Sequence, residues 1–119
     1  MWNLIRGWSR KWSSWIGDRD LELALRKHLD SQGFYGDSAK FEGIRLAAVQ
    51  RPGWLQVFVF TVEAKERSER SKSLQLHGIV RQDERYNKTD VRTFVAKYER
   101  NSLFREWSED LIRLRGARL

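Results

Sequence analysis

Histidine is the side chain most often used as a general base near neutral pH, and this sequence has only two, His28 and His77. His28 falls in the last turn of a predicted helix, where a positive charge interacts favourably with the helix dipole. His77 lies between Leu76 and Gly78 in a predicted strand, with no cysteine or second histidine beside it. The pattern favours a capping role for His28 and an ordinary strand position for His77.

Metal binding and nucleophilic catalysis have even fewer candidate residues. The chain contains no cysteine, which excludes thiolate ligands, cysteine nucleophiles and disulfides. Its acid pairs, Asp83-Glu84 and Glu109-Asp110, fall in an expected turn and on an expected exposed helix face, where solvation explains them. The stretch 33–36 resembles a helix stop and a turn, not a loop that cradles phosphate. We therefore predict no catalytic residue, no metal site, no cofactor and no enzyme activity.

The strongest signal lies in residues 1–17, which hold four of the six tryptophans and three cations but no acid. At helical spacing the apolar residues share one face, so this Trp-rich segment is predicted to be an amphipathic helix. Indoles favour the headgroup boundary of a bilayer, and cations add attraction to anionic lipid. The predicted membrane- or partner-binding residues are Trp2, Leu4, Ile5, Arg6, Trp8, Arg10, Lys11, Trp12, Trp15 and Ile16.

Other destinations for the Trp-rich segment stay open. The same apolar stripe could pack on the chain's own sheet or on a protein partner, including a membrane-protein complex. An acid-free segment with Arg and Ser also fits a mitochondrial presequence, which we keep as an alternative. No apolar run reaches the roughly 18 residues that span a bilayer. We therefore expect a small adaptor or binding protein that is cytoplasmic and peripheral to an anionic membrane surface.

A formal net charge of +7 also favours anionic partners in general and makes nucleic acid the second hypothesis. Cations alternate with aromatic residues near the expected turns of the sheet, a pattern that can neutralise and stack nucleic acid. Acids alternate with the same cations, and no helix is dense in Arg and Lys, so this hypothesis ranks below the membrane. Its candidate residues are Arg51, Trp54, Arg81, Arg85 and Lys88.

Two helices are expected in the remainder of the chain. The first begins after Asp18 as N-cap, has leucines at every fourth position from Leu21 to Leu29, and ends at Gly33 in the left-handed conformation. The last runs from a cap at 101 or 102 to Gly116, with an apolar stripe. That stripe consists of Leu103, Phe104, Trp107, Leu111 and Leu114.

Four strands are predicted between these helices, over about 42–50, 54–64, 74–81 and 89–98. The second strand is apolar on both faces and is expected to be central. Short connections favour an antiparallel meander, so the predicted fold class is α+β, a four-stranded sheet with both helices on one face and the Trp-rich helix preceding them. The other face would be open and partly apolar, available for a homodimer contact or, as a third hypothesis, an enzyme's small ligand. Residues 18–119 are predicted to form one domain.

Overall fold

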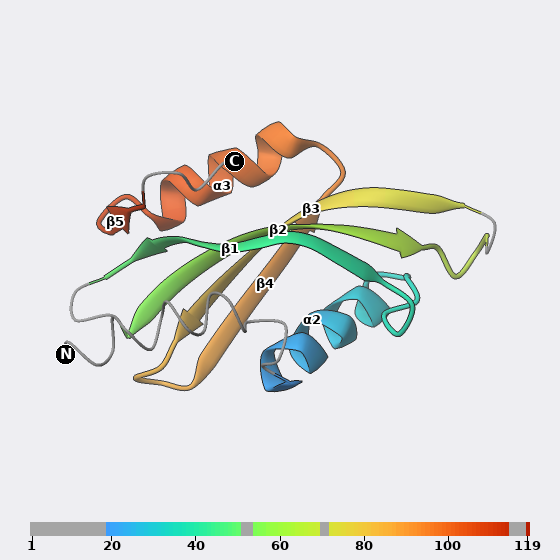
Figure 1. The fold of residues 1–119 in the computed structure, drawn as a ribbon, viewed down its shortest axis with the longest axis horizontal. Coiled ribbons are helices and arrows are strands. Elements are labelled where there is room, and N and C mark those ends of the chain that lie inside the picture. The colour runs from blue at the N-terminus through green and yellow to red at the C-terminus, as the bar shows by residue number, and fades with distance from the viewer. Residues whose placement is uncertain (1–18, 51–53, 70–71, 115–118) are drawn as a thin grey trace.

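The computed structural model of this chain describes residues 19–50, 54–69, 72–114 and 119, to which the following account applies (Figure 1). Within these residues, antiparallel strands form a five-stranded sheet in the order β4-β3-β2-β1-β5, together with two helices. The fold class is therefore α+β. The elements are α2 (Arg19–Ser31), β1 (Lys40–Val49), β2 (Leu55–Lys65), β3 (Ser73–Asp83), β4 (Lys88–Phe94), α3 (Lys97–Trp107) and β5 (Ile112–Arg113).

The central position predicted for β2 is confirmed. β2 pairs with β3 along its whole length, from Leu55 opposite Asp83 to Lys65 opposite Ser73, and with β1 on its other side. The first three strands lie within a few residues of their predicted bounds. The fifth strand, β5, was not predicted; it pairs with the end of β1 and makes the sheet five-stranded instead of four-stranded.

The sheet is the middle layer of three, with α2 on one face and α3 on the other (Figure 1). Alternate residues of β2 contact different helices: Phe58 and Phe60 cluster with the leucines of α2. Val57 and Val59 cluster with Phe104 of α3. The prediction that both helices share one face is wrong, because a central strand that is apolar on both sides requires cover on both. The sheet face that was expected to be open, and on which a homodimer contact was predicted, is therefore covered by a helix.

Helix α2 follows the sequence pattern closely. Leu21, Leu25 and Leu29 are all buried, and each contributes about 1.5–3 kcal/mol relative to an exposed side chain. Gly33 follows the helix with a φ of 89°, which is the left-handed conformation predicted for it. The expected N-cap, Asp18, lies outside the described residues.

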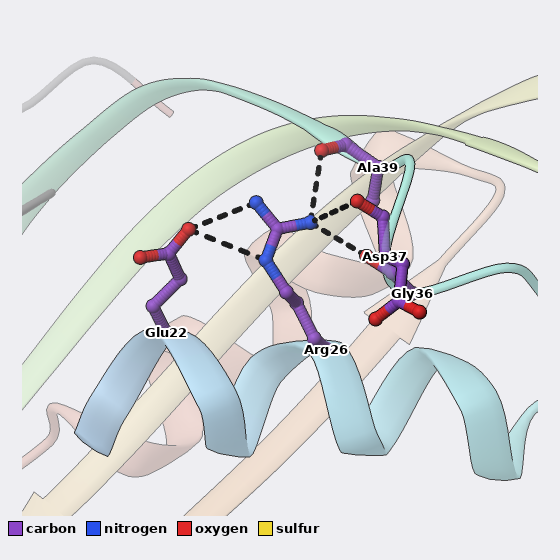
Figure 2. A network of polar contacts seen from close by, with 5 residues as sticks. All are labelled: Glu22, Arg26, Gly36, Asp37 and Ala39. Carbon is purple, nitrogen blue, oxygen red and sulfur yellow. Dashed lines mark hydrogen bonds and ion pairs between the residues drawn. The ribbon is translucent and has the colours of Figure 1, made fainter. Parts of the chain in front are cut away.

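Arg26 ties α2 to the loop that leads into β1 (Figure 2). Its Nη2 donates to Glu22 Oε1 at 2.8 Å, one turn earlier on the helix. Its Nη1 donates to the backbone oxygens of Gly36, Asp37 and Ala39 at 2.6, 3.2 and 3.3 Å. A Cβ atom at Gly36 would overlap the backbone oxygen of Arg26, so this close approach requires glycine. The network fixes where β1 enters the sheet relative to α2.

The last helix differs from its prediction at both ends. β4 ends at Phe94, and α3 begins at Lys97, inside the stretch predicted as strand 89–98. At the other end, Ser108 donates its backbone N–H and its hydroxyl to the Phe104 oxygen, and the helix does not continue. Leu111 still packs against the core cluster that contains Phe104, but it lies beyond the end of the helix. The apolar spacing from Leu103 to Leu111 therefore reflects burial of side chains on both sides of the true helix end, whereas Leu114 is exposed.

Candidate functional site

The residues predicted to bind a membrane or a partner, Trp2 to Ile16, lie outside the described residues. The described chain resumes at Arg19, the first residue of α2. None of the helices in the described ranges is long and apolar enough to cross a bilayer.

Three of the residues proposed for nucleic-acid binding meet at one end of the sheet. Leu55 pairs with Asp83, and Asp83 pairs with Lys88, so Trp54, before β2, lies beside the turn between β3 and β4. The Glu84 N–H also donates to the Trp54 oxygen at 2.8 Å. The structure therefore brings Trp54, Arg85 and Lys88 together, whereas Arg51 lies outside the described residues.

At this end, Trp54, Arg85 and Tyr86 form what we call the turn cluster. The Arg85 guanidinium lies 4.8 Å from the centre of the Trp54 ring and 5.1 Å from that of Tyr86. Arg85 also binds the Asp83 carboxylate at 3.3 Å, and its hydrogen bond to that carboxylate lowers the pKa of Asp83. Tyr86 is 72% exposed. The cluster therefore presents an aromatic face to solvent, while part of its positive charge is already balanced.

Arg81 belongs to a different group of side chains. Its guanidinium lies 4.7 Å from the centre of the Trp107 ring on α3 and forms an ion pair with Asp90 at 3.1 Å. Arg92 lies 5.9 Å from the same ring. Sequence reasoning did not connect Trp107 with these arginines, because α3 and β3 are brought together only by the folding of the sheet.

His28 does not act as the helix-capping cation that its position predicts. Its Nε2 lies 3.4 Å from the Thr93 hydroxyl, and burial, followed by repulsion from Arg92, lowers the pKa of its imidazole. A pKa below the ordinary 6.5 leaves this ring neutral at neutral pH. Burial and the repulsion from Arg92 therefore outweigh the favourable interaction of a cation with the dipole at the end of α2.

The lowered pKa of His28 predicts a loss of stability in mild acid. Unfolding restores the ordinary pKa of 6.5, so below that pH the unfolded chain binds protons more readily than the folded chain. The contribution to stability is complete above this pH and is lost as the pH falls through the ordinary value towards the folded one. Urea unfolding at about pH 7 and about pH 5 should show this loss, and His28→Gln should reduce it. An unchanged pH dependence in His28→Gln would contradict the assignment.

Arg100 is the charged residue that sequence analysis missed. It is 1% exposed, and its Nη1 donates to the backbone oxygens of Phe60 and Gly78 at 3.3 and 3.2 Å. Its Nε donates to the Asn101 side-chain oxygen at 2.8 Å. Burial, together with Arg45, lowers the pKa of Arg100 to about 10, so it remains charged at neutral pH. A usable signal was present, because Arg100 extends the stripe of Phe104 and Trp107 backwards at helical spacing.

Comparisons with known proteins gave no match, whether to family models, curated proteins or solved structures. Within the described ranges, no group of three or more His, Asp or Glu side chains is arranged to hold a metal ion. The features of this chain that bear on its function are the Trp-rich segment and the turn cluster.

Proposed function

We propose that this chain is a small binding or adaptor protein attached peripherally to an anionic membrane surface, or to a membrane complex, through its Trp-rich segment. The observation that carries the proposal is the cover of the sheet. Each apolar face already has a helix from the described part of the chain, α2 on one side and α3 on the other. Because both faces are covered, we expect the indoles of residues 1–17 to bind a surface outside the domain.

Charge decides the preference for anionic lipid. Arg6, Arg10 and Lys11 occur in a segment without acids, and each contributes about 1 kcal/mol close to an anionic leaflet. Together they should strengthen binding on the order of 100-fold over a neutral bilayer. Because the segment contains no long apolar run, this binding should be reversible and sensitive to salt.

Co-sedimentation of the full chain with phosphatidylcholine vesicles, with and without phosphatidylglycerol, tests this proposal. We expect binding to the anionic vesicles and a loss of at least about tenfold when Arg6, Arg10 and Lys11 are changed to Gln. Changing the exposed Lys27, Lys40 and Lys65 to Gln removes the same charge and should alter binding by less than about threefold. Equal losses in the two variants, or equal binding to neutral vesicles, would refute the proposal.

Single-stranded nucleic acid is a second candidate partner, favoured by the exposed ring of the turn cluster. Tyr86 is exposed beside a cation and a second ring, an arrangement on which bases stack. Tyr86→Ala should then weaken oligonucleotide binding about tenfold in a fluorescence titration. Tyr98 is 73% exposed on α3, so Tyr98→Ala is a matched control that should leave binding unchanged. The same affinity in both variants would exclude the turn cluster as the binding site.

A further inference from the structure

The outer edge of β4 is open in the part of the chain that the structure describes. β4 comes first in the strand order β4-β3-β2-β1-β5, so β3 is the only strand of this sheet that pairs with it. Its seven residues pair with β3 in unbroken register, from Lys88 opposite Asp83 to Phe94 opposite His77. A regular edge strand presents a row of unpaired backbone groups on which another strand can pair.

The opposite edge of the sheet is less suited to such pairing. β5 covers the end of β1, at Ala48 and Val49. The pairing of β1 with β2 shifts register between Glu42 and Arg45, and Gly43, inside this shift, has a φ of 59°. Irregularities of this kind twist an edge away from an incoming strand. The regular edge is therefore that of β4.

Hydrogen bonding at the turn between β3 and β4 shows which backbone groups point to this open edge. The Glu84 N–H donates to the oxygen of Trp54, just before β2, so Glu84 faces β2. Because facing directions alternate along an antiparallel ladder, the preceding Asp83 faces β4, and its partner Lys88 faces β3. Every second residue of β4 after Lys88 therefore faces outwards, and these are Thr89, Val91 and Thr93. All three are β-branched, which suits a strand.

The side chains of β4 are complementary to a second copy of the same strand. When two copies run antiparallel about Val91, Asp90 of one copy lies opposite Arg92 of the other, and Thr89 lies opposite Thr93. Opposite charges and paired threonines that face each other across strands both stabilise the pairing. The two-fold symmetry repeats each of these contacts.

Both charged side chains can make this contact. Asp90 binds Arg81 through its Oδ2 atom, and a carboxylate has a second oxygen that can accept another donor. Among the ion pairs between residues that the structure describes, none involves Arg92. The Arg92 Nη1 instead donates to the Val91 oxygen at 2.9 Å, as expected for a carbonyl that faces the open edge. An acid from a second copy would therefore give Arg92 a counter-charge.

We propose that two copies of this chain form a two-fold symmetric dimer through the open edges of β4, so that their sheets join into one. The outward backbone groups of Thr89, Val91 and Thr93 bond to those of the second copy. The contact uses neither of the sheet faces that α2 and α3 cover, and it does not involve the Trp-rich segment. Seven residues from each copy are fewer than a standard interface contains, so the dissociation constant should be on the order of 10–100 μM.

Sedimentation velocity of the full chain, from roughly 1 to 500 μM, tests for this dimer. Arg92→Asp places an acid opposite Asp90 in both halves of the contact and should weaken the dimer at least about tenfold. Adding Asp90→Arg restores opposite charges and should return the dissociation constant to within about threefold of the parent chain. The matched control is Lys65→Asp, the same change of charge at an exposed residue two strands from β4, which should alter it by less than about twofold.

A second variant keeps the test decisive if the exchanged charges disturb the pair between Arg81 and Asp90. Thr89→Pro removes an N–H that faces outwards, so it costs no bond to β3 and leaves β4 in its sheet. We expect this variant to remain folded by circular dichroism and to stay monomeric at about 500 μM.

Amide hydrogen exchange at low and high protein concentration locates the contact. The amides of Thr89, Val91 and Thr93 should gain protection at high concentration, whereas those of Asp90 and Arg92, which face β3, should be protected at both. A chain that stays monomeric, or a dimer in which the three outward amides gain no protection, would overturn the proposal. Equal effects of Arg92→Asp and Lys65→Asp would overturn it as well. Self-association that protects residues 1–17 instead would assign the contact to the Trp-rich segment.

Discussion

Gly78→Ala is expected to lower the free energy of unfolding by about 3 kcal/mol, because the site has no room for a methyl group. Gly78 is buried in β3 opposite Phe60 of β2, and a Cβ at this position would overlap the Phe60 ring. Phe60 is itself 1% exposed and packs in the core cluster that contains the leucines of α2. Its ring therefore cannot move aside without disturbing its neighbours. Urea denaturation at equilibrium measures the change.

Two comparisons isolate this steric cause. Gly33 has a φ of 89° and no atom within 4 Å of its would-be Cβ, so Gly33→Ala should cost only about 1 kcal/mol from backbone strain. Adding Phe60→Leu to Gly78→Ala should relieve the overlap and make the double variant less unstable than the sum of the single changes. Equal effects of the two glycine substitutions, or strict additivity in the double variant, would show that the ring does not limit the site.

Substitutions of Arg100 should change the free energy of unfolding by different amounts, according to whether they keep or remove its aliphatic stem. Arg100→Ala leaves a cavity and three oxygens without their donor, so it is expected to cost about 3 kcal/mol. Arg100→Met retains most of the apolar stem and removes a charge that is costly to bury. We expect Arg100→Met to lie within about 1 kcal/mol of the parent chain.

Thermal and urea unfolding of both variants measure these effects. A loss in Arg100→Met as large as that in Arg100→Ala would mean that the hydrogen bonds, not the packing of the stem, carry the contribution of Arg100.

Periodicity predicted the parts of the fold that depend on local burial. The buried leucines of α2, its glycine stop and the two-sided apolar pattern of β2 were all visible in the sequence. The placement of the helices was not, because connections alone do not determine which face each helix covers. β5 has only two residues, too few to show a period. The start of α3 was missed because Val95 and Tyr98 continue the alternation of a strand although both are exposed.

The candidate binding residues divide in the same way, into those that local sequence groups together and those that only folding brings together. Trp54, Arg85 and Lys88 lie together at one end of the sheet, because neighbouring turns of an antiparallel sheet meet there. Arg81 was assigned to the same group, but its partners are Trp107 and Asp90, which lie far from it in sequence or on another strand.

Amide hydrogen exchange of the full chain, alone and on phosphatidylglycerol vesicles, measures whether the Trp-rich segment binds outside the domain. We expect residues 1–17 to exchange rapidly in the free protein and to gain protection on the vesicles, while the β2 and β3 amides keep the same protection. Slow exchange of residues 1–17 in the free protein, with no change on vesicles, would contradict this expectation and indicate that the indoles are buried in the chain's own fold.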